Sequence, residues 1–138
     1  MNLIYQAHSG VRYLVLLAGV VALILLVRGL LARTPYAGAA RGATAAFAGL
    51  LHLQILLGVA VVVMGVWYSA LMGHLVMMIL AGATAGILGR WARTATDARQ
   101  AHRLALAAVV ASLLLVVGGI AAIGRSPLES RALTTDSR

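Results

Sequence analysis

The chain has 138 residues, of which 62% are hydrophobic and 10% are charged, and its formal net charge is +8. A soluble domain of this length carries about 25% charged residues, so the composition excludes a water-exposed globule and predicts an integral membrane protein. All eleven basic residues are arginines near the ends of apolar runs, which favours membrane topology over nucleic-acid binding, and the lack of cysteine excludes disulfides, thiolate metal sites and c-type haem attachment.

Four apolar segments, each long enough to cross a membrane, follow one another along the chain. A helix needs about 20 residues, at 1.5 Å each, to cross the hydrocarbon. The predicted spans cover residues 8–31, 43–66, 70–90 and 100–123. A histidine lies ahead of the first apolar run, which argues against a cleaved signal peptide, so residues 1–31 are expected to stay as a helix.

The links between these spans differ in composition. The first contains a proline and two arginines, the second is short and aromatic, and the third is strongly basic. Because backbone in lipid must satisfy its own hydrogen bonds, the spans are expected to be helices. We therefore predict an all-α fold, an up-down-up-down four-helix transmembrane bundle over residues 1–124, followed by a polar tail over residues 125–138.

The arginines also predict orientation. They concentrate in the first and third links and are absent from the second. The first and third links should therefore face the cytoplasm, and both termini should face outward. Small residues such as Gly82, Gly86 and Gly89 let helices approach closely, and helix packing or an alanine-rich composition accounts for them at least as well as a functional role.

The four histidines, His8, His52, His74 and His102, each lie in a different apolar segment. Ionisable residues inside membrane spans are rare and mark functional sites. With both termini outside, His8 opens the first span and His74 lies about 6 Å inside the outer mouth of the third. The first and third spans are diagonal in an up-down bundle, so these two imidazoles are expected to meet across a cavity and clamp a porphyrin from both faces.

Residues beside His8 and His74 fit a haem pocket. Met78 lies one helical turn after His74, where an adaptable thioether fills space around a macrocycle. Arg12 lies one turn after His8, on the same helix face, and its planar guanidinium suits a haem propionate. The alternative is that Arg12 only extends to lipid phosphate.

His52 and His102 are weaker candidate ligands. His52 is expected near mid-membrane, where a hydrogen bond to a neighbouring helix is its default role. His102, next to Arg103, is expected at the inner interface. Their depths differ by about 12 to 15 Å, so they pair poorly around a second haem unless the fourth helix starts earlier or is shifted.

The stretch LLHLQILLGVAVVVMGVWYSALMGHLVMMILAG resembles part of one half of the haem A synthase family. In each half of that family a helix opens with histidine and arginine, the next carries Q-x-L-L-G, and a third opens with a histidine. His8, the segment 54–58 and His74 match these elements, although Arg12 comes four residues after His8 rather than next to it.

The resemblance covers the first three spans, about 80 residues. It implies that the two motif histidines, here His8 and His74, face haem. Family members have two such halves and eight helices, whereas this chain has one half. The resemblance therefore implies a small b-type cytochrome on a similar bundle rather than haem A synthesis.

The leading hypothesis is a b-type cytochrome of the bacterial cytoplasmic (inner) membrane. His8 and His74 would be the metal ligands of one haem b near the extracytoplasmic face, and a second haem on His52 and His102 is a less favoured extension. Two histidine ligands leave no open iron position, which suits electron transport by a subunit of a respiratory complex more than a stand-alone enzyme.

Expected partners are the lipid bilayer, other membrane subunits or an extracytoplasmic redox partner, and a quinone. Nucleic acid is not among them. The main alternative is a haem-free membrane anchor or assembly subunit of a larger complex. A transporter or proton relay is disfavoured because no Asp or Glu lies within a predicted span.

Overall fold

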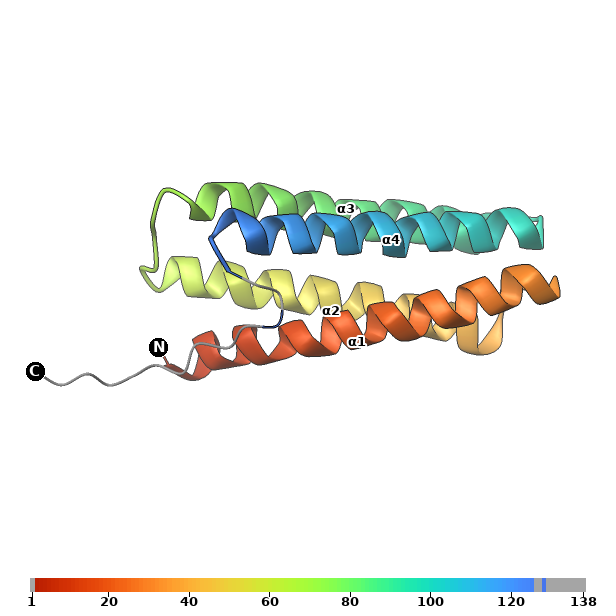
Figure 1. Cartoon of the computed structure of the whole chain (residues 1–138), viewed down its shortest axis with the longest axis horizontal. Coiled ribbons are helices and arrows are strands. Elements are labelled where there is room, and N and C mark those ends of the chain that lie inside the picture. The colour runs from red at the N-terminus through yellow and green to blue at the C-terminus, as the bar shows by residue number, and fades with distance from the viewer. Residues whose placement is uncertain (1, 126–127, 129–138) are drawn as a thin grey trace, which may run out of the picture.

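The computed structural model describes residues 2–125 and residue 128, and the ordered elements in this part of the chain are four helices. They are α1 (Asn2–Ala32), α2 (Gly38–Val63), α3 (Leu71–Thr94) and α4 (Ala98–Ala122). Each is long and apolar enough to cross a membrane. Figure 1 shows them antiparallel to their chain neighbours, so the predicted all-α, up-down-up-down bundle is confirmed.

The helices extend beyond the apolar segments that predicted them. α1 begins at Asn2 rather than near residue 8, α2 begins at Gly38 rather than near residue 43, and α3 runs on to Thr94. Hydropathy marks only the part of a helix that lies in hydrocarbon, whereas backbone hydrogen bonding continues through the interface. The predicted tail, residues 125–138, lies outside the described residues except for positions 125 and 128.

Local signals in the links end one helix and begin the next. After α1, Arg33 adopts a positive φ of 55°, and the amide of Thr34 donates to the carbonyl of Gly29 at 3.0 Å. Gly65, with a φ of 96°, turns the chain after α2. Before α4, the carboxylate of Asp97 caps the helix by accepting from the amide of Gln100 at 2.7 Å.

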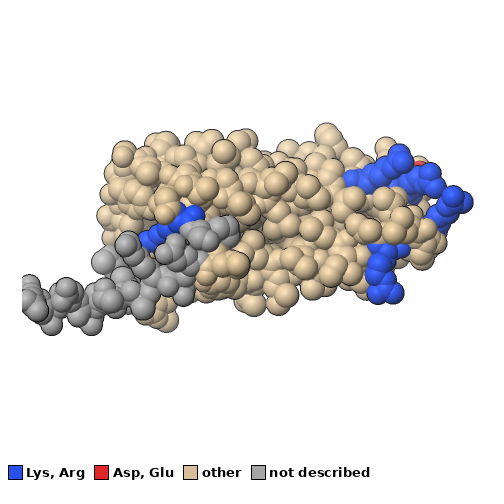
Figure 2. Space-filling view, viewed as in Figure 1, with Lys and Arg blue, Asp and Glu red and all other residues tan. Residues whose placement is uncertain are grey.

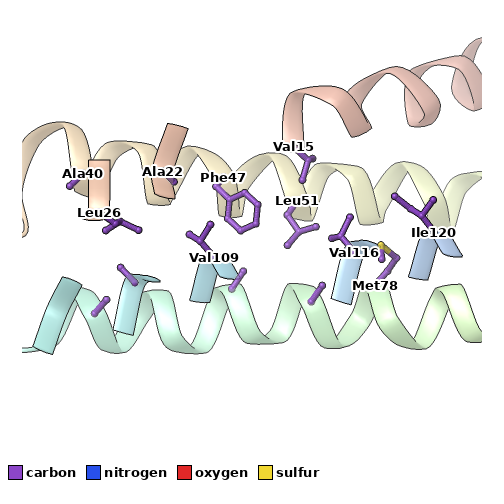
Figure 3. Packing of buried hydrophobic residues seen from close by; sticks show 14 residues of the cluster. Val15, Ala22, Leu26, Ala40, Phe47, Leu51, Met78, Val109, Val116 and Ile120 are labelled. Carbon is purple, nitrogen blue, oxygen red and sulfur yellow. The ribbon is translucent and has the colours of Figure 1, made fainter. Parts of the chain in front are cut away.

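The bundle is built from two hairpins. α1 packs mainly on α2 and α3 packs mainly on α4, while smaller contacts between α1 and α4 and between α2 and α3 join the hairpins. Within the described residues α1 and α3 make no direct backbone contact, so they are diagonal, as predicted. Phe47, Leu51 and Val109 are among the fully buried side chains between the hairpins (Figure 3).

Glycine allows the hairpins to approach each other. A Cβ on Gly82 of α3 would lie 2.6 Å from the terminal methyl of Ile55 on α2. A Cβ on Gly19 of α1 would lie 2.9 Å from a methyl of Leu113 on α4. The packing interpretation of Gly82 is therefore confirmed.

The two ends of the bundle differ in charge. Figure 2 shows arginine gathered at the end formed by the α1–α2 and α3–α4 links. At the opposite end, the described residues contribute only Arg12 and Arg125. This second end also holds the first turns of α1 and α3, where two of the histidines lie.

Candidate functional site

A cavity of about 200 Å³ lies at the end of the bundle opposite the arginine-rich links. Apolar side chains from all four helices form most of its wall, among them Leu51, Val116 and Ile120. Its main polar members are the side chains of His8, Arg12, Gln54, His74 and Arg125. The cavity therefore has an apolar interior and a small set of ionisable groups, as cofactor sites do.

His8 and His74 face each other in this cavity. Their ring centres are 6.4 Å apart, and the ring planes are nearly perpendicular, at 86°. The two residues come from the diagonal helices α1 and α3, whose backbones make no direct contact in the described part of the chain. The expectation that these two rings meet across the diagonal is confirmed.

His8 is held by α2 through a pair of hydrogen bonds. Its ring Nδ1 lies 3.1 Å from the backbone carbonyl of Gln54, and the Gln54 side-chain Nε2 donates to the carbonyl of His8 at 2.7 Å. A carbonyl only accepts, so Nδ1 carries a proton, and in the neutral ring Nε2 then keeps a lone pair. Gly58, one turn further along α2, gives the ring room, because a Cβ there would lie 3.0 Å from the His8 Cε1.

His74 is held by α4 in the same way. Its Nδ1 donates to the backbone carbonyl of Gly119 at 2.9 Å, so the neutral ring again keeps a lone pair on Nε2. The position of Gly119 also requires a small residue. A Cβ there would lie 2.7 Å from the Met78 Cε and 3.5 Å from the His74 Nδ1. Each imidazole is thus oriented by a carbonyl from the other helix of its own hairpin.

This arrangement is suited to binding one metal ion between the rings. Metal-binding histidines commonly donate the second ring N–H to a backbone carbonyl, which fixes the tautomer and the ring orientation. A metal–imidazole bond is about 2 Å long, so a metal shared by two imidazoles separates the ring centres by roughly 6 to 6.5 Å. The observed separation of 6.4 Å falls in this range.

The donor set also fits haem iron. A haem iron accepts two axial nitrogen ligands and takes its other four from the porphyrin. The apolar cavity wall and the adjacent guanidinium groups suit the faces and the carboxylates of a porphyrin, respectively. His8 and His74 are the residues that would hold the iron.

Arg12 and Met78 lie where the sequence placed them, against the same cavity. Met78 is buried, with 7% of its surface exposed. Arg12 is 9% exposed, its Nη2 donates to the hydroxyl of Tyr13 at 2.9 Å, and its guanidinium carbon lies 4.7 Å from the centre of the Tyr13 ring. This burial favours the cavity role predicted for Arg12 over the alternative, in which the side chain only extends to lipid phosphate.

His52 lies elsewhere, and its expected default role is wrong. The side chain is exposed on the surface of the bundle, and its Nδ1 donates to the carbonyl of Ala48 on its own helix at 2.6 Å rather than to a neighbouring helix. The ring lies against Gly82 and Gly86 of α3, with ring atoms 3.8 Å from the position of a Cβ at each. The helix face that His52 occupies, which depth alone does not specify, is the reason for the error.

His102 lies near the start of α4, at the arginine-rich end where it is predicted. Its side chain is buried within the bundle, with only 1% of its surface exposed. Its Nδ1 donates to the carbonyl of Ala98 at 2.9 Å, and its ring packs edge-on against Tyr36, with centres 5.4 Å apart. Its Nε2 is buried against Gly29 with no hydrogen-bond partner among the described residues. Burial follows because Gly29 leaves space that a side chain would fill.

Sequence reasoning assigned no role to three supporting residues. Gln54 and Gly58 are the first and last residues of the Q-I-L-L-G motif, and both contact His8. The motif and His8 belong to the same resemblance, which is a signal that the two could be in contact. Gly119 lies in an apolar, glycine-containing run with no feature that marks it as the partner of His74.

Comparisons with known proteins add no family assignment. No family model, no curated protein and no solved structure matches this chain. The resemblance to the haem A synthase family therefore stays a prediction. The function has to be inferred from the geometry of the site.

Proposed function

We propose that this protein is a membrane b-type cytochrome that holds one haem b between His8 and His74. The observation that supports this most strongly is the pair of imidazoles 6.4 Å apart, each with Nδ1 bonded to a backbone carbonyl of a different helix. In the neutral tautomer that donates from Nδ1, both rings keep an Nε2 lone pair that can bind a metal.

The residues of the site have separate roles in this proposal. His8 and His74 would hold the haem iron, and two histidine ligands would leave no open position for oxygen or substrate. The bound haem would supply one-electron redox chemistry. Met78 and Ile120 line the cavity and exclude water from the ligand faces, while Arg12 offers a positive charge to a carboxylate. Such a site carries electrons and does not transform a substrate.

The charge asymmetry of the bundle supports an orientation. Arginine-rich links face the cytoplasm in most membrane proteins, and here they lie at the end opposite the site. We therefore infer a site near the extracytoplasmic face of a bacterial cytoplasmic membrane. One haem at that depth would exchange electrons with a quinone, an extracytoplasmic redox protein or another subunit of a membrane complex.

An absorption spectrum tests the proposal. The full chain, purified from membranes in mild detergent with haem supplied during growth, is expected to show a Soret band and, on reduction, the split bands of low-spin haem b. A pyridine haemochrome assay is expected to give about one haem per chain. A well-folded protein that stays colourless, also after addition of haem, would overturn the proposal and favour the haem-free anchor or assembly subunit.

A further inference from the structure

Arg125 reaches the cavity because of the way α4 ends. Gly124 has a φ of +68°, a left-handed conformation that glycine adopts without strain. The amide of Gly124 donates to the carbonyl of Ala121 at 2.9 Å, and the amide of Arg125 donates to that of Ile120 at 3.3 Å. This turn directs the chain back over the helix end and places Arg125 in the wall of the cavity that contains the two histidines.

Each of the two arginines in this cavity donates a hydrogen bond to a different tyrosine hydroxyl of α1. Arg125 Nη1 donates to the Tyr5 hydroxyl at 3.0 Å, and Arg12 Nη2 donates to the Tyr13 hydroxyl at 2.9 Å. Side chains on a helix lean toward its N-terminus, so Arg12 extends from α1 toward the end where Arg125 lies. The two guanidiniums are therefore presented to one cavity from opposite hairpins.

A further contact brings the two arginines to the same region. The Tyr13 hydroxyl, which accepts from Arg12, lies 3.4 Å from the backbone carbonyl of Leu128, three residues after Arg125.

We propose that Arg125 and Arg12 together bind the two carboxylates of the ligand that His8 and His74 hold, an inference that rests on the proposed function. Each guanidinium presents a planar fork of donors that matches one carboxylate. The ligand then lies with its carboxylate edge toward the end of the bundle that holds Tyr5 and Arg125, and with its apolar edge toward Val116 and Leu51.

This arrangement matches the charges of a porphyrin to those of the cavity wall. A porphyrin with two propionates carries two carboxylates, and the largely apolar wall contains two guanidiniums, one from each hairpin. Arg125 is therefore a binding residue of the site, and the turn at Gly124 positions it.

The test compares two porphyrins on the full chain prepared haem-free from haem-deficient cells. Iron protoporphyrin IX and its dimethyl ester, which lacks both negative charges, are titrated into wild type, Arg125→Gln and the control Arg103→Gln from the arginine-rich end. Wild type and the control are expected to prefer the free acid by about a hundredfold, and Arg125→Gln by about tenfold, since a charge-assisted contact accounts for about tenfold in affinity. Tyr5→Phe is expected to be intermediate and Arg125→Lys to recover part of the preference.

The ratio of the two affinities is compared between variants, so differences in how the two porphyrins partition into detergent micelles cancel. If the ratio in Arg125→Gln equals that of the wild type, whether both affinities stay the same or fall by the same factor, the role of Arg125 is overturned. The proposed cytochrome would remain intact. Failure of the wild-type chain to bind either porphyrin would overturn both proposals.

Discussion

Two of the four histidines face each other at one end of the bundle, and the other two do not, although all four bond Nδ1 to a backbone carbonyl. For His8 and His74 the carbonyls belong to a second helix, at Gln54 and Gly119. An acceptor on another helix fixes the ring relative to the whole bundle. Both rings are held in this way toward one cavity.

His52 and His102 bond carbonyls four residues earlier on their own helices, at Ala48 and Ala98. A bond of this kind satisfies the ring nitrogen locally and is available on any face of a helix. One of these rings is exposed on the bundle surface, and the other is buried against Gly29. Neither is oriented toward another histidine.

A histidine in a membrane span is therefore not by itself evidence of a ligand. What distinguishes a candidate ligand is the partner of its second nitrogen. Acceptors on a neighbouring helix produce a rigid, pre-oriented ring, whereas acceptors on the same helix do not.

The largest effect is expected from removing the histidines themselves. His8→Ala or His74→Ala should remove nearly all bound haem, because one ligand of the iron is lost and its place opens to solvent. His52→Ala and His102→Ala are the matched controls and should keep the wild-type spectrum. The measurement is haem per chain after purification, with the elution volume of the detergent complex as a check of folding. Equal loss of haem in all four variants would contradict the assignment of His8 and His74, and not His52 and His102, as ligands.

Filling the space beside His8 should have the next largest effect. Gly58→Val places side-chain atoms against the His8 ring, since even a Cβ there would lie 3.0 Å from Cε1. Overpacking costs about 1 to 3 kcal/mol, so haem affinity is expected to fall by roughly ten- to a hundredfold. Gly49→Val on the same helix is the control, because a Cβ there meets nothing within 4 Å. Equal affinities in these two variants would contradict the assignment.

The same manipulation at His102 should affect stability and leave the haem unchanged. A Cβ on Gly29 would overlap with the His102 Nε2, so Gly29→Ala is expected to destabilise the bundle by about 1 to 3 kcal/mol. The double variant Gly29→Ala with His102→Ala should recover most of this loss. Thermal unfolding in detergent measures the effect, and a shifted haem spectrum would show that His102 belongs to the site after all.

The smallest effect is expected from the side chain of Gln54. Gln54→Leu removes the 2.7 Å bond to the His8 carbonyl but keeps the backbone carbonyl that accepts from the His8 ring. A net hydrogen bond contributes about 1 kcal/mol, so stability should fall by about that amount and haem affinity by a few-fold. A loss of haem as complete as in His8→Ala would mean that Gln54 acts on the ligand directly.

Hydropathy and arginine placement were enough to predict the four helices, their order and the meeting of His8 with His74. That meeting needed only depth along two diagonal helices. The faces of His52 and His102 were not predictable in this way, because the spans are apolar on all sides and provide no hydrophobic stripe that marks inside from outside. The contacts of Gly119 and Gly29 depend on helix rotation, which a uniformly apolar sequence leaves unspecified.

Electron paramagnetic resonance of the oxidised, purified chain tests whether His8 and His74 hold one iron between them. Two imidazoles on one iron with ring planes near 86° should give the highly anisotropic low-spin signal of perpendicular axial ligands. That signal should vanish in His74→Ala and persist in His102→Ala. A high-spin signal in the wild type, or a low-spin signal that survives the loss of His74, would contradict the account.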